Sequence, residues 1–376
     1  MLNPDQTTPT IKTNSEGENP RFDFNRHPSL VIWELTSGCP FQGRFTKQHQ
    51  RNPLSLREAF RVIDLIKAAR PSLLILTAGD LVNQADLNGI IARAADNGLR
   101  VALSPTPCVT PLFLTADLHA LKRLGLRRIC LKLNGATSEV HDEFLGIQGS
   151  WKCTMEAIQR AKAAGIETQI ETTFTRRNRA EYEALSALLL IIKPSLWNVS
   201  PLIRNEASGA IAHSEVLNSE EAEKLLVQLC ALKANASYEI TTTDAPQFRR
   251  IALQHHEQSI LKNLASTSLN DGRGQVFINH LGEITPGPHL PLVAGSVRET
   301  KLIDTYRNSR VFRELRNPSL LKGKCGYCEF NSICGGSRAR AYAATGDYLA
   351  QDPLCDYHPR AARSSTGESW RMYCDD

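Results

Sequence analysis

The chain has 376 residues, of which 41% are hydrophobic and 22% are charged, as in an ordinary soluble globular protein. Its net charge of +5 is small and no long Lys or Arg run occurs, so we expect neither nucleic acid nor a membrane as a partner. Residues 1–28 are polar and lack the apolar core of a signal peptide, and no segment approaches the roughly 18–20 apolar residues of a membrane span. We therefore expect a disordered N-terminal arm and a cytoplasmic protein.

From residue 30 onward, short apolar runs alternate with longer stretches in which apolar residues recur at helical spacing. The runs, rich in β-branched and aromatic residues, predict strands at 30–35, 73–77, 100–104, 128–134, 166–175 and 196–202. The stretches between them predict helices at 55–69, 87–98, 117–125, 153–165 and 180–193. Ser55 is placed to cap the first helix, and Gly98, Gly125 and Gly165 lie where helices should end.

Six strand–helix units at this spacing are typical of parallel βαβ structure, so the sequence predicts an α/β fold. Six units are too few for a complete eight-fold barrel and suit an open, partial (β/α)6 barrel, which we place at residues 29–205. A Rossmann-type sheet is the competing architecture. No G-x-G-x-x-G phrase follows the first strand, so the dinucleotide-binding fingerprint is missing.

The alternation ends near residue 205. Residues 206–273 are predicted to form a connection, with a helix at 219–235 and a strand that leads into a turn over 238–250. Residues 274–287 predict a β-hairpin that turns at Leu281 and Gly282, and residues 302–315 predict a short helix. We expect a small C-terminal domain at 274–359, followed by a tail at 360–376.

The distribution of the ten cysteines indicates metal ligands rather than disulfides. Most of the others are scattered singly, but Cys325, Cys328, Cys334 and Cys355 crowd one short segment. They form a C-x2-C-x5-C motif with a more distant fourth cysteine, and Gly326 permits the tight turn that this spacing needs. Four cysteines suit either tetrahedral zinc or a [4Fe–4S] cluster, and the spacing alone leaves that choice open.

Several phrases together resemble one known family: VIWELTSGCP at the first strand, then LKGKCGYCEFNSICGGSRARAYAATGD and DPLC near the C-terminus. The chain resembles the radical S-adenosylmethionine (radical SAM) enzymes with a C-terminal SPASM/twitch domain, and among them the haem- and peptide-modifying members. The resemblance implies a partial (β/α)6 barrel with a small iron–sulfur module. It assigns the four clustered cysteines to one auxiliary [4Fe–4S] cluster, which favours iron–sulfur over zinc.

Longer SPASM domains hold a second auxiliary cluster, which uses a cysteine four residues after the third one and further cysteines upstream. In this chain the first of these positions is Arg338, and the upstream phrase GEITPGPHLP contains no cysteine. The resemblance therefore implies a single auxiliary cluster.

The family's core cluster is bound by a C-x3-C-x2-C motif just after the first strand. Here the three positions are Cys39, Gly43 and Thr46. Glycine has no side chain and a threonine hydroxyl is a poor iron ligand, so one thiolate remains for a cluster that needs three. In the family this cluster delivers the electron that cleaves S-adenosylmethionine to a 5′-deoxyadenosyl radical. The sequence therefore predicts a degenerate member without reductive cleavage.

The resemblance also indicates residues that could contact S-adenosylmethionine, and some of them are altered. They are Ala78, Gly79 and Asp80 after the second predicted strand, Asn134 after the fourth, and Thr175 and Arg176 after the fifth. Relatives have Gly-Gly-Glu-Pro at the first set, so Asp80 keeps the charge on a shorter arm, and Asn134 replaces a carboxylate. A solvated basic turn is the alternative role of Arg176. Binding of S-adenosylmethionine is left open by these changes.

Two further sets of polar residues are candidates for substrate binding. Asp244, Arg249 and Arg250 follow a predicted strand, where two arginines could clamp the carboxylates of a porphyrin or peptide or form a surface salt-bridge patch. His280 and His289 flank the predicted hairpin and could ligate haem iron or a metal, whereas a lone histidine more often has a structural role.

Three functions follow from these features. The first is a degenerate radical SAM/SPASM homologue with one auxiliary cluster, serving as a binding, electron-transfer or partner protein in a cofactor- or peptide-modification pathway. Its partner would be an active radical SAM paralogue or a small-molecule or peptide substrate. The second is an active radical SAM enzyme that modifies a tetrapyrrole or peptide. The third is a zinc-stapled binding protein.

Overall fold

The computed structural model describes residues 23–36, 54–78, 86–106, 114–204, 213–255 and 269–360. Within these residues the strands form one sheet in the order β11-β10-β9-β1-β2-β3-β4-β5-β6-β7, with β8 paired to β9. Its strands are β1 (Leu30–Thr36), β2 (Leu73–Ala78), β3 (Val101–Pro105), β4 (Leu126–Lys132), β5 (Glu167–Phe174), β6 (Leu196–Pro201), β7 (Glu239–Thr242), β8 (Asn270–Asp271), β9 (Gly274–Ile278), β10 (Glu283–Thr285) and β11 (Gly295–Ser296). Strands β1 to β7 are all parallel to their neighbours, which confirms the predicted parallel α/β fold.

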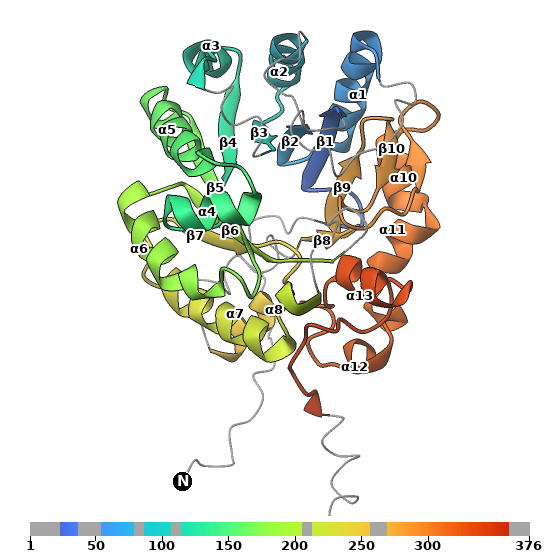
Figure 1. Ribbon diagram of the computed structural model, residues 1–376. Helices are drawn as coiled ribbons and strands as arrows, with labels where there is room; N and C mark the ends of the chain where they lie inside the picture. The colour runs from blue at the N-terminus through green and yellow to red at the C-terminus, as the bar shows by residue number, and fades with distance from the viewer. Residues whose placement is uncertain are drawn as a thin grey trace, which may run out of the picture.

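The sheet curves into an open barrel with helices on its outer side (Figure 1). These helices are α1 (Leu56–Ala69), α2 (Leu87–Asp96), α3 (Leu118–Arg123), α4 (Ser138–Leu145), α5 (Ser150–Ala163), α6 (Tyr182–Ile192) and α7 (Ser219–Lys233). Alternate residues of each strand face this layer: Val31, Trp33 and Leu35 of β1 are buried in the main core together with Ile63 and Ile66 of α1. The intervening residues of β1 are half-buried. The apolar ones among them pack against a small buried cluster of Ile75, Ala102 and Cys130 from β2, β3 and β4.

Several local predictions are confirmed. Ser55 caps α1 in a capping box, because the backbone N–H of Glu58 donates to Ser55 Oγ and that of Ser55 donates to the Glu58 carboxylate. Gly98, Gly125 and Gly165 follow helices and have positive φ angles of 79°, 107° and 69°. These helix ends were predictable because the chemistry that defines them is local.

Other elements differ from the prediction. Helix α4 was not expected, and residues predicted as a turn form α8 (Gln247–Gln254), in which six consecutive residues are buried by tertiary contacts. The helix predicted at 302–315 is two helices, α10 (Leu302–Asn308) and α11 (Arg310–Leu315), because Ser309 between them is extended. The expected hairpin is present as β9 and β10, with Gly282 at φ 83° in its turn.

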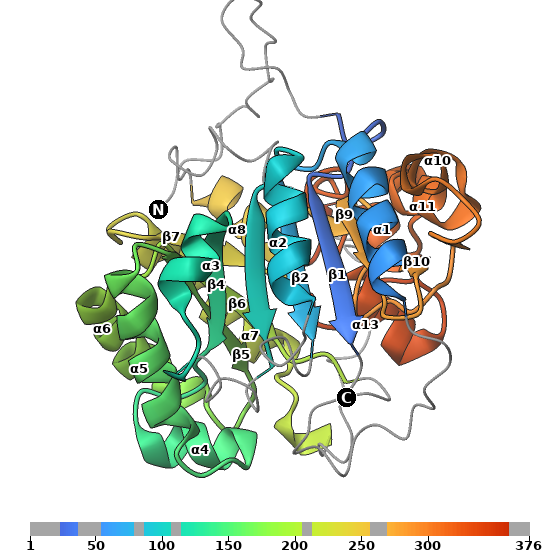
Figure 2. The same cartoon turned by 90° about the horizontal axis from the view of Figure 1, so that it is seen from above.

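The C-terminal part of the chain continues the barrel sheet before it forms a separate cluster of short helices. Strand β9 pairs in parallel with β1, so the C-terminal strands extend the sheet beyond its first strand. The last segment contains α12 (Gly323–Gly326) and α13 (Arg338–Thr345), which lie beside the barrel (Figures 1 and 2). The predicted domain boundaries at 205, 273 and 359 stay predictions.

Helix α8 connects the cysteine-bearing segment to the edge of the sheet that β7 forms. The helix follows β7 at one edge, whereas the segment follows β11 at the other. Gln247 of α8 donates to Asp352 at 2.7 Å, and Arg249 donates to the carbonyl oxygen of Ile333 at 2.9 Å. The cysteine-bearing segment is therefore held between both edges of the curved sheet. In the described part of the chain, no helix has the length and apolar character needed to cross a membrane.

Candidate functional site: a four-cysteine pocket

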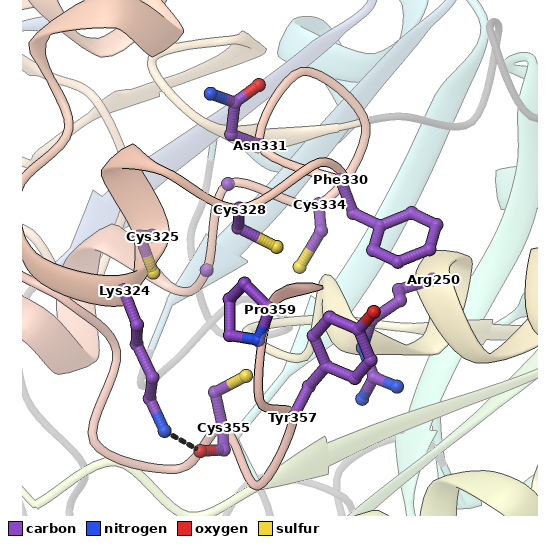
Figure 3. A pocket seen from close by; sticks show the side chains of 12 residues that line it. Arg250, Lys324, Cys325, Cys328, Phe330, Asn331, Cys334, Cys355, Tyr357 and Pro359 are labelled. Carbon is purple, nitrogen blue, oxygen red and sulfur yellow. Dashed lines mark hydrogen bonds between the residues drawn. The ribbon is translucent and has the colours of Figure 1, made fainter. Parts of the chain in front are cut away.

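Four cysteines from separate turns of the C-terminal segment line one pocket. Cys325 lies on α12, Cys328 and Cys334 lie in the loop that follows it, and Cys355 comes from the chain beyond α13. Figure 3 shows their sulfur atoms directed toward the same space. The pocket has about 350 Å³ of space, part of it open to solvent. The four thiols predicted as ligands are thus brought together by the fold.

Glycines make the tight path of this loop possible. A Cβ at Gly326 would lie 2.3 Å from the carbonyl oxygen of Leu321, so no other residue fits there. Gly335 and Gly336 both have φ angles of 67°, and a Cβ at Gly336 would lie 3.1 Å from Cys325 Sγ. The backbone therefore approaches the thiols as closely as it can, which keeps the pocket small.

The thiols are largely shielded from water, and this disfavours their deprotonated form. Cys325 and Cys334 are 7% and 9% exposed. Burial raises the pKa of Cys334 to about 12 and that of Cys355 to about 11. Cys325 Sγ accepts hydrogen bonds from the backbone N–H of Asp352 at 3.4 Å and from Arg338 Nη2 at 3.8 Å. Thiolates at these positions require a strong positive partner, such as a metal centre.

The pocket wall also contains basic and aromatic side chains. Lys324 donates to the carbonyl oxygen of Cys355. Arg250 donates to Glu223 at 2.7 Å, and its guanidinium lies 4.8 Å from the ring centre of Tyr357. Arg249, next to it on α8, donates to the carbonyl oxygens of Ile333 and Leu269. Both arginines predicted as a substrate clamp therefore have partners within the protein, and the clamp itself stays a prediction.

The resemblance places a ligand of a second auxiliary cluster at Arg338, and this side chain is packed within the protein. Arg338 is 2% exposed, and its guanidinium donates to the carbonyl oxygens of Tyr348 and Ala350 at 3.0 and 2.8 Å. A Cβ at Gly287, in the upstream phrase without cysteine, would lie 1.8 Å from Asp271 Oδ1. No side chain of any kind fits at that glycine without moving Asp271.

The predicted S-adenosylmethionine contacts fall into two groups. Cys39, Gly43, Thr46, Gly79 and Asp80 lie outside the described residues. Ala78 ends β2, while Asn134, Thr175 and Arg176 lie beyond the carboxyl ends of β4 and β5.

The described members of this set have protein partners. Asn134 accepts from the backbone N–H of Thr173 at 2.9 Å. The backbone N–H of Thr175 donates to Asn178 at 2.8 Å, and Arg176 donates to Glu221 at 2.8 Å. Their role toward S-adenosylmethionine stays a prediction.

Two histidine–carboxylate pairs lie at the same end of the barrel. His280 is hydrogen-bonded through Nδ1 to Glu34 of β1 at 2.7 Å and is buried. His289 is hydrogen-bonded through Nδ1 to Asp244 at 2.7 Å, and its side chain is 45% exposed. Burial works to lower the pKa of His289, but the charge of Asp244 and the hydrogen bond to it outweigh burial and raise that pKa. His289 is therefore the more accessible of the two predicted ligands.

Sequence reasoning missed three charged residues around these pairs. Lys132 of β4 is paired with Glu171 of β5 on the inner face of the barrel. Asp271 of β8 is 3% exposed, and burial together with the nearby charge of Asp244 raises its pKa to about 7. Alternation along β4 and β5 could have placed the first two inside the barrel, but only the fold places Asp271 beside Asp244.

A parallel, partial β/α barrel with a four-cysteine module at its C-terminal end defines the class of protein. The model of the radical SAM superfamily matches residues 36–189. An AdoMet-dependent heme synthase of Oleidesulfovibrio alaskensis is 31% identical over 344 residues, which covers 88% of each chain. The chain therefore belongs to the radical SAM superfamily, as its sequence motifs predicted.

More distant relatives and solved structures agree on the fold. A PqqA peptide cyclase of Ruegeria pomeroyi is 25% identical over 365 residues, covering 92% of this chain and 91% of the relative. The crystal structure of Streptococcus suis SuiB bound to S-adenosylmethionine matches 88% of this chain and 76% of that one, at 12% identity and a TM-score of 0.62. Its likeness shows the fold, which is the partial barrel with a SPASM-type C-terminal module.

Proposed function

We propose that this protein is a radical SAM homologue that binds one auxiliary [4Fe–4S] cluster and has lost reductive cleavage of S-adenosylmethionine. It would act as a binding, electron-transfer or partner protein in a cofactor- or peptide-modification pathway. The observation that carries the proposal is the convergence of four cysteine thiols on one pocket. A bound cluster would supply one-electron transfer, and Cys325, Cys328, Cys334 and Cys355 would hold it.

Membership of the radical SAM superfamily favours a cluster over zinc at these thiols. A zinc ion holds its four sulfur ligands about 2.3 Å from a single centre, whereas each thiolate of a cluster binds a different iron.

The filled space around Arg338 supports a single auxiliary cluster. The resemblance places one ligand of a second cluster where buried Arg338 lies and further ligands upstream, where the phrase GEITPGPHLP contains no cysteine. Arginine is not a ligand for iron.

Loss of reductive cleavage rests on the sequence of the core motif. Cys39 is followed by Gly43 and Thr46 where the family has two further cysteines. One thiolate cannot hold a cubane cluster in water, and the side chains that remain supply orientation and charge rather than low-potential electrons.

An active enzyme that modifies a tetrapyrrole or a peptide is the second candidate. It is favoured by the heme synthase that is 31% identical and by the PqqA peptide cyclase, both of which match along most of their length. His289 offers this candidate an accessible imidazole whose Nδ1 is already fixed by Asp244, which is the arrangement of histidines that bind metal through Nε2.

Metal analysis and a cleavage assay separate these functions. The chain is reconstituted with iron and sulfide without oxygen, and iron, sulfide and zinc are then measured alongside 5′-deoxyadenosine formation. The proposed function predicts about four irons per chain and no 5′-deoxyadenosine. An active enzyme needs about eight irons and forms the product, whereas one zinc and no sulfide would support the zinc-stapled alternative.

A further inference from the structure

Arg338 places a buried positive charge against the cysteine pocket. It is the first residue of α13 and is 2% exposed. Its Nη2 lies 3.8 Å from Cys325 Sγ, while Nη1 donates to the carbonyl oxygens of Tyr348 and Ala350. Its Nε donates to the carbonyl oxygen of Gly336 at 3.2 Å. These hydrogen bonds fix the orientation of the guanidinium, so that Nη2 is held next to the thiol.

This guanidinium forms no direct ion pair. Within the described residues, every hydrogen bond of Arg338 ends on a carbonyl oxygen or on Cys325 Sγ, and the charges of Asp271 and Asp347 act on it without a hydrogen bond. Nearby Arg340 and Arg250, in contrast, are paired with the carboxylates of Asp352 and Glu223. The guanidinium is therefore free to stabilise negative charge on the thiol that it contacts.

Arg249 lies near a second cysteine, because it binds the carbonyl oxygen of Ile333, the residue before Cys334. It is 8% exposed and donates to the carbonyl oxygens of Ile333 and Leu269. Burial lowers the pKa of Arg249 to about 10, and the electrostatic influence of Cys334 works in the opposite direction. The side chain therefore remains charged at neutral pH. One buried arginine thus contacts Cys325 and another lies next to Cys334, and within the described residues neither is hydrogen-bonded to a carboxylate.

We propose that Arg338 and Arg249 are built-in counter-charges that raise the reduction potential of the auxiliary cluster and make it an electron acceptor. This inference rests on the proposed function, because it requires the cluster at the four cysteines. A cluster held by four thiolates is negatively charged, and reduction adds one more negative charge. Fixed cations beside the thiolates stabilise the reduced form more than the oxidised form.

The proposed step transfers one electron to the cluster. The oxidised cluster takes one electron from a low-potential one-electron donor, such as a reduced flavin or iron–sulfur protein, and that donor is oxidised by one electron. No covalent bond forms or breaks, and no proton is needed because arginine already carries the compensating charge. A raised potential suits a centre that receives electrons, and it is the opposite of what reductive cleavage of a sulfonium demands.

Redox titration of the reconstituted full-length protein tests the inference. The cluster is titrated with dithionite in the presence of mediators and followed by electron paramagnetic resonance, for the unaltered chain and for Arg338→Met, Arg338→Lys and Arg249→Met. We expect Arg338→Met to make reduction about tenfold less favourable at a given potential, a shift of about 59 mV for one electron. Arg249→Met should shift it in the same direction, and Arg338→Lys should keep most of the unaltered potential because it keeps the charge.

Arg316 provides the matched control. It too donates to carbonyl oxygens, those of Tyr306 and Arg307, but its hydrogen bonds within the described residues reach neither a pocket cysteine nor a residue next to one. Arg316→Met should leave the potential unchanged. An unchanged potential in Arg338→Met at normal iron content overturns the inference; if that variant does not fold, an unchanged potential in Arg249→Met overturns it instead. Failure of the unaltered chain to take up iron would instead refute the proposed function.

Discussion

At the scale of single residues, Asp352 organises the ligand segment although sequence reasoning did not single it out. Its carboxylate is fully buried and accepts from the backbone N–H of Ser337 and from Gln247 Nε2, both at 2.7 Å. Arg340 lies within 3.3 Å of the same oxygen. The backbone N–H of Asp352 donates to Cys325 Sγ. One residue therefore connects α8, α13 and the thiol pocket.

Asp352→Asn should destabilise the module and impair cluster assembly. The amide presents N–H donors where the neighbouring groups are already donors, and it leaves Arg340 without its counter-charge. Breaking a buried pair in this way costs about 3–5 kcal/mol. Asp347 is the control, because it is half-exposed and paired with Lys322, and Asp347→Asn should cost less than about 1 kcal/mol. Urea unfolding of both variants measures the loss in the free energy of unfolding. Equal losses would mean that Asp352 stabilises the module no more than Asp347 does.

Cys334→Ser should abolish the brown iron–sulfur chromophore, because a hydroxyl cannot replace a buried thiolate ligand. Cys130 is a matched control: it is 1% exposed but lies in the apolar base of the barrel, away from the pocket. Cys130→Ser and Cys39→Ser should keep both the chromophore and the iron content. Absorbance and iron analysis decide the matter, and a loss of half the iron in Cys39→Ser would mean that the core site is occupied after all.

At the scale of elements, the module after α11 has little hydrophobic core of its own. A small cluster of Ile203, Leu290, Leu315 and Ala339 supports it, while the main core belongs to the barrel and its helices. Small units of this kind depend on metal centres for folding free energy. The module is therefore expected to rely on its cluster, whereas the strands of the barrel are not.

Removal of iron should expose the module to proteolysis and spare the barrel. After treatment with a chelator and an oxidant, residues 323–360 should become sensitive to trypsin, because the four thiols no longer share one centre. Strands β1 to β6 and the paired β9 should stay resistant, since their packing does not involve the pocket. Fragment masses before and after treatment provide the measurement. Uniform protection after complete loss of iron contradicts a structural role for the cluster.

At the scale of the whole molecule, the sequence predicted the repeated strands and helices. It did not predict the features that depend on contacts between residues far apart in the chain. Strand and helix periods revealed the barrel, and the cysteine spacing revealed the pocket that residues 325–355 form. Helix α8 was missed because it is short and because its polar residues are buried by distant segments, as when Gln247 binds Asp352. The close approach of Asp271 to Gly287 likewise joins residues that no local motif links. From the sequence, Arg338 was only a position where longer SPASM domains have a cysteine. Its contact with Cys325 became evident only in the folded structure.

The last prediction concerns the chemistry of the whole protein. Reductive cleavage of S-adenosylmethionine requires a cluster with an open iron next to the sulfonium, and the core motif keeps only Cys39 for that purpose. The auxiliary pocket cannot replace it, because four thiolates leave no iron open and Arg338 would make its cluster an acceptor. With dithionite and excess S-adenosylmethionine we therefore expect no 5′-deoxyadenosine above background. Gly43→Cys combined with Thr46→Cys should raise the iron content from about four to about eight per chain and permit slow cleavage if the barrel edge still binds the substrate. Steady turnover by the unaltered chain, measured as 5′-deoxyadenosine per protein, would refute the loss of radical chemistry.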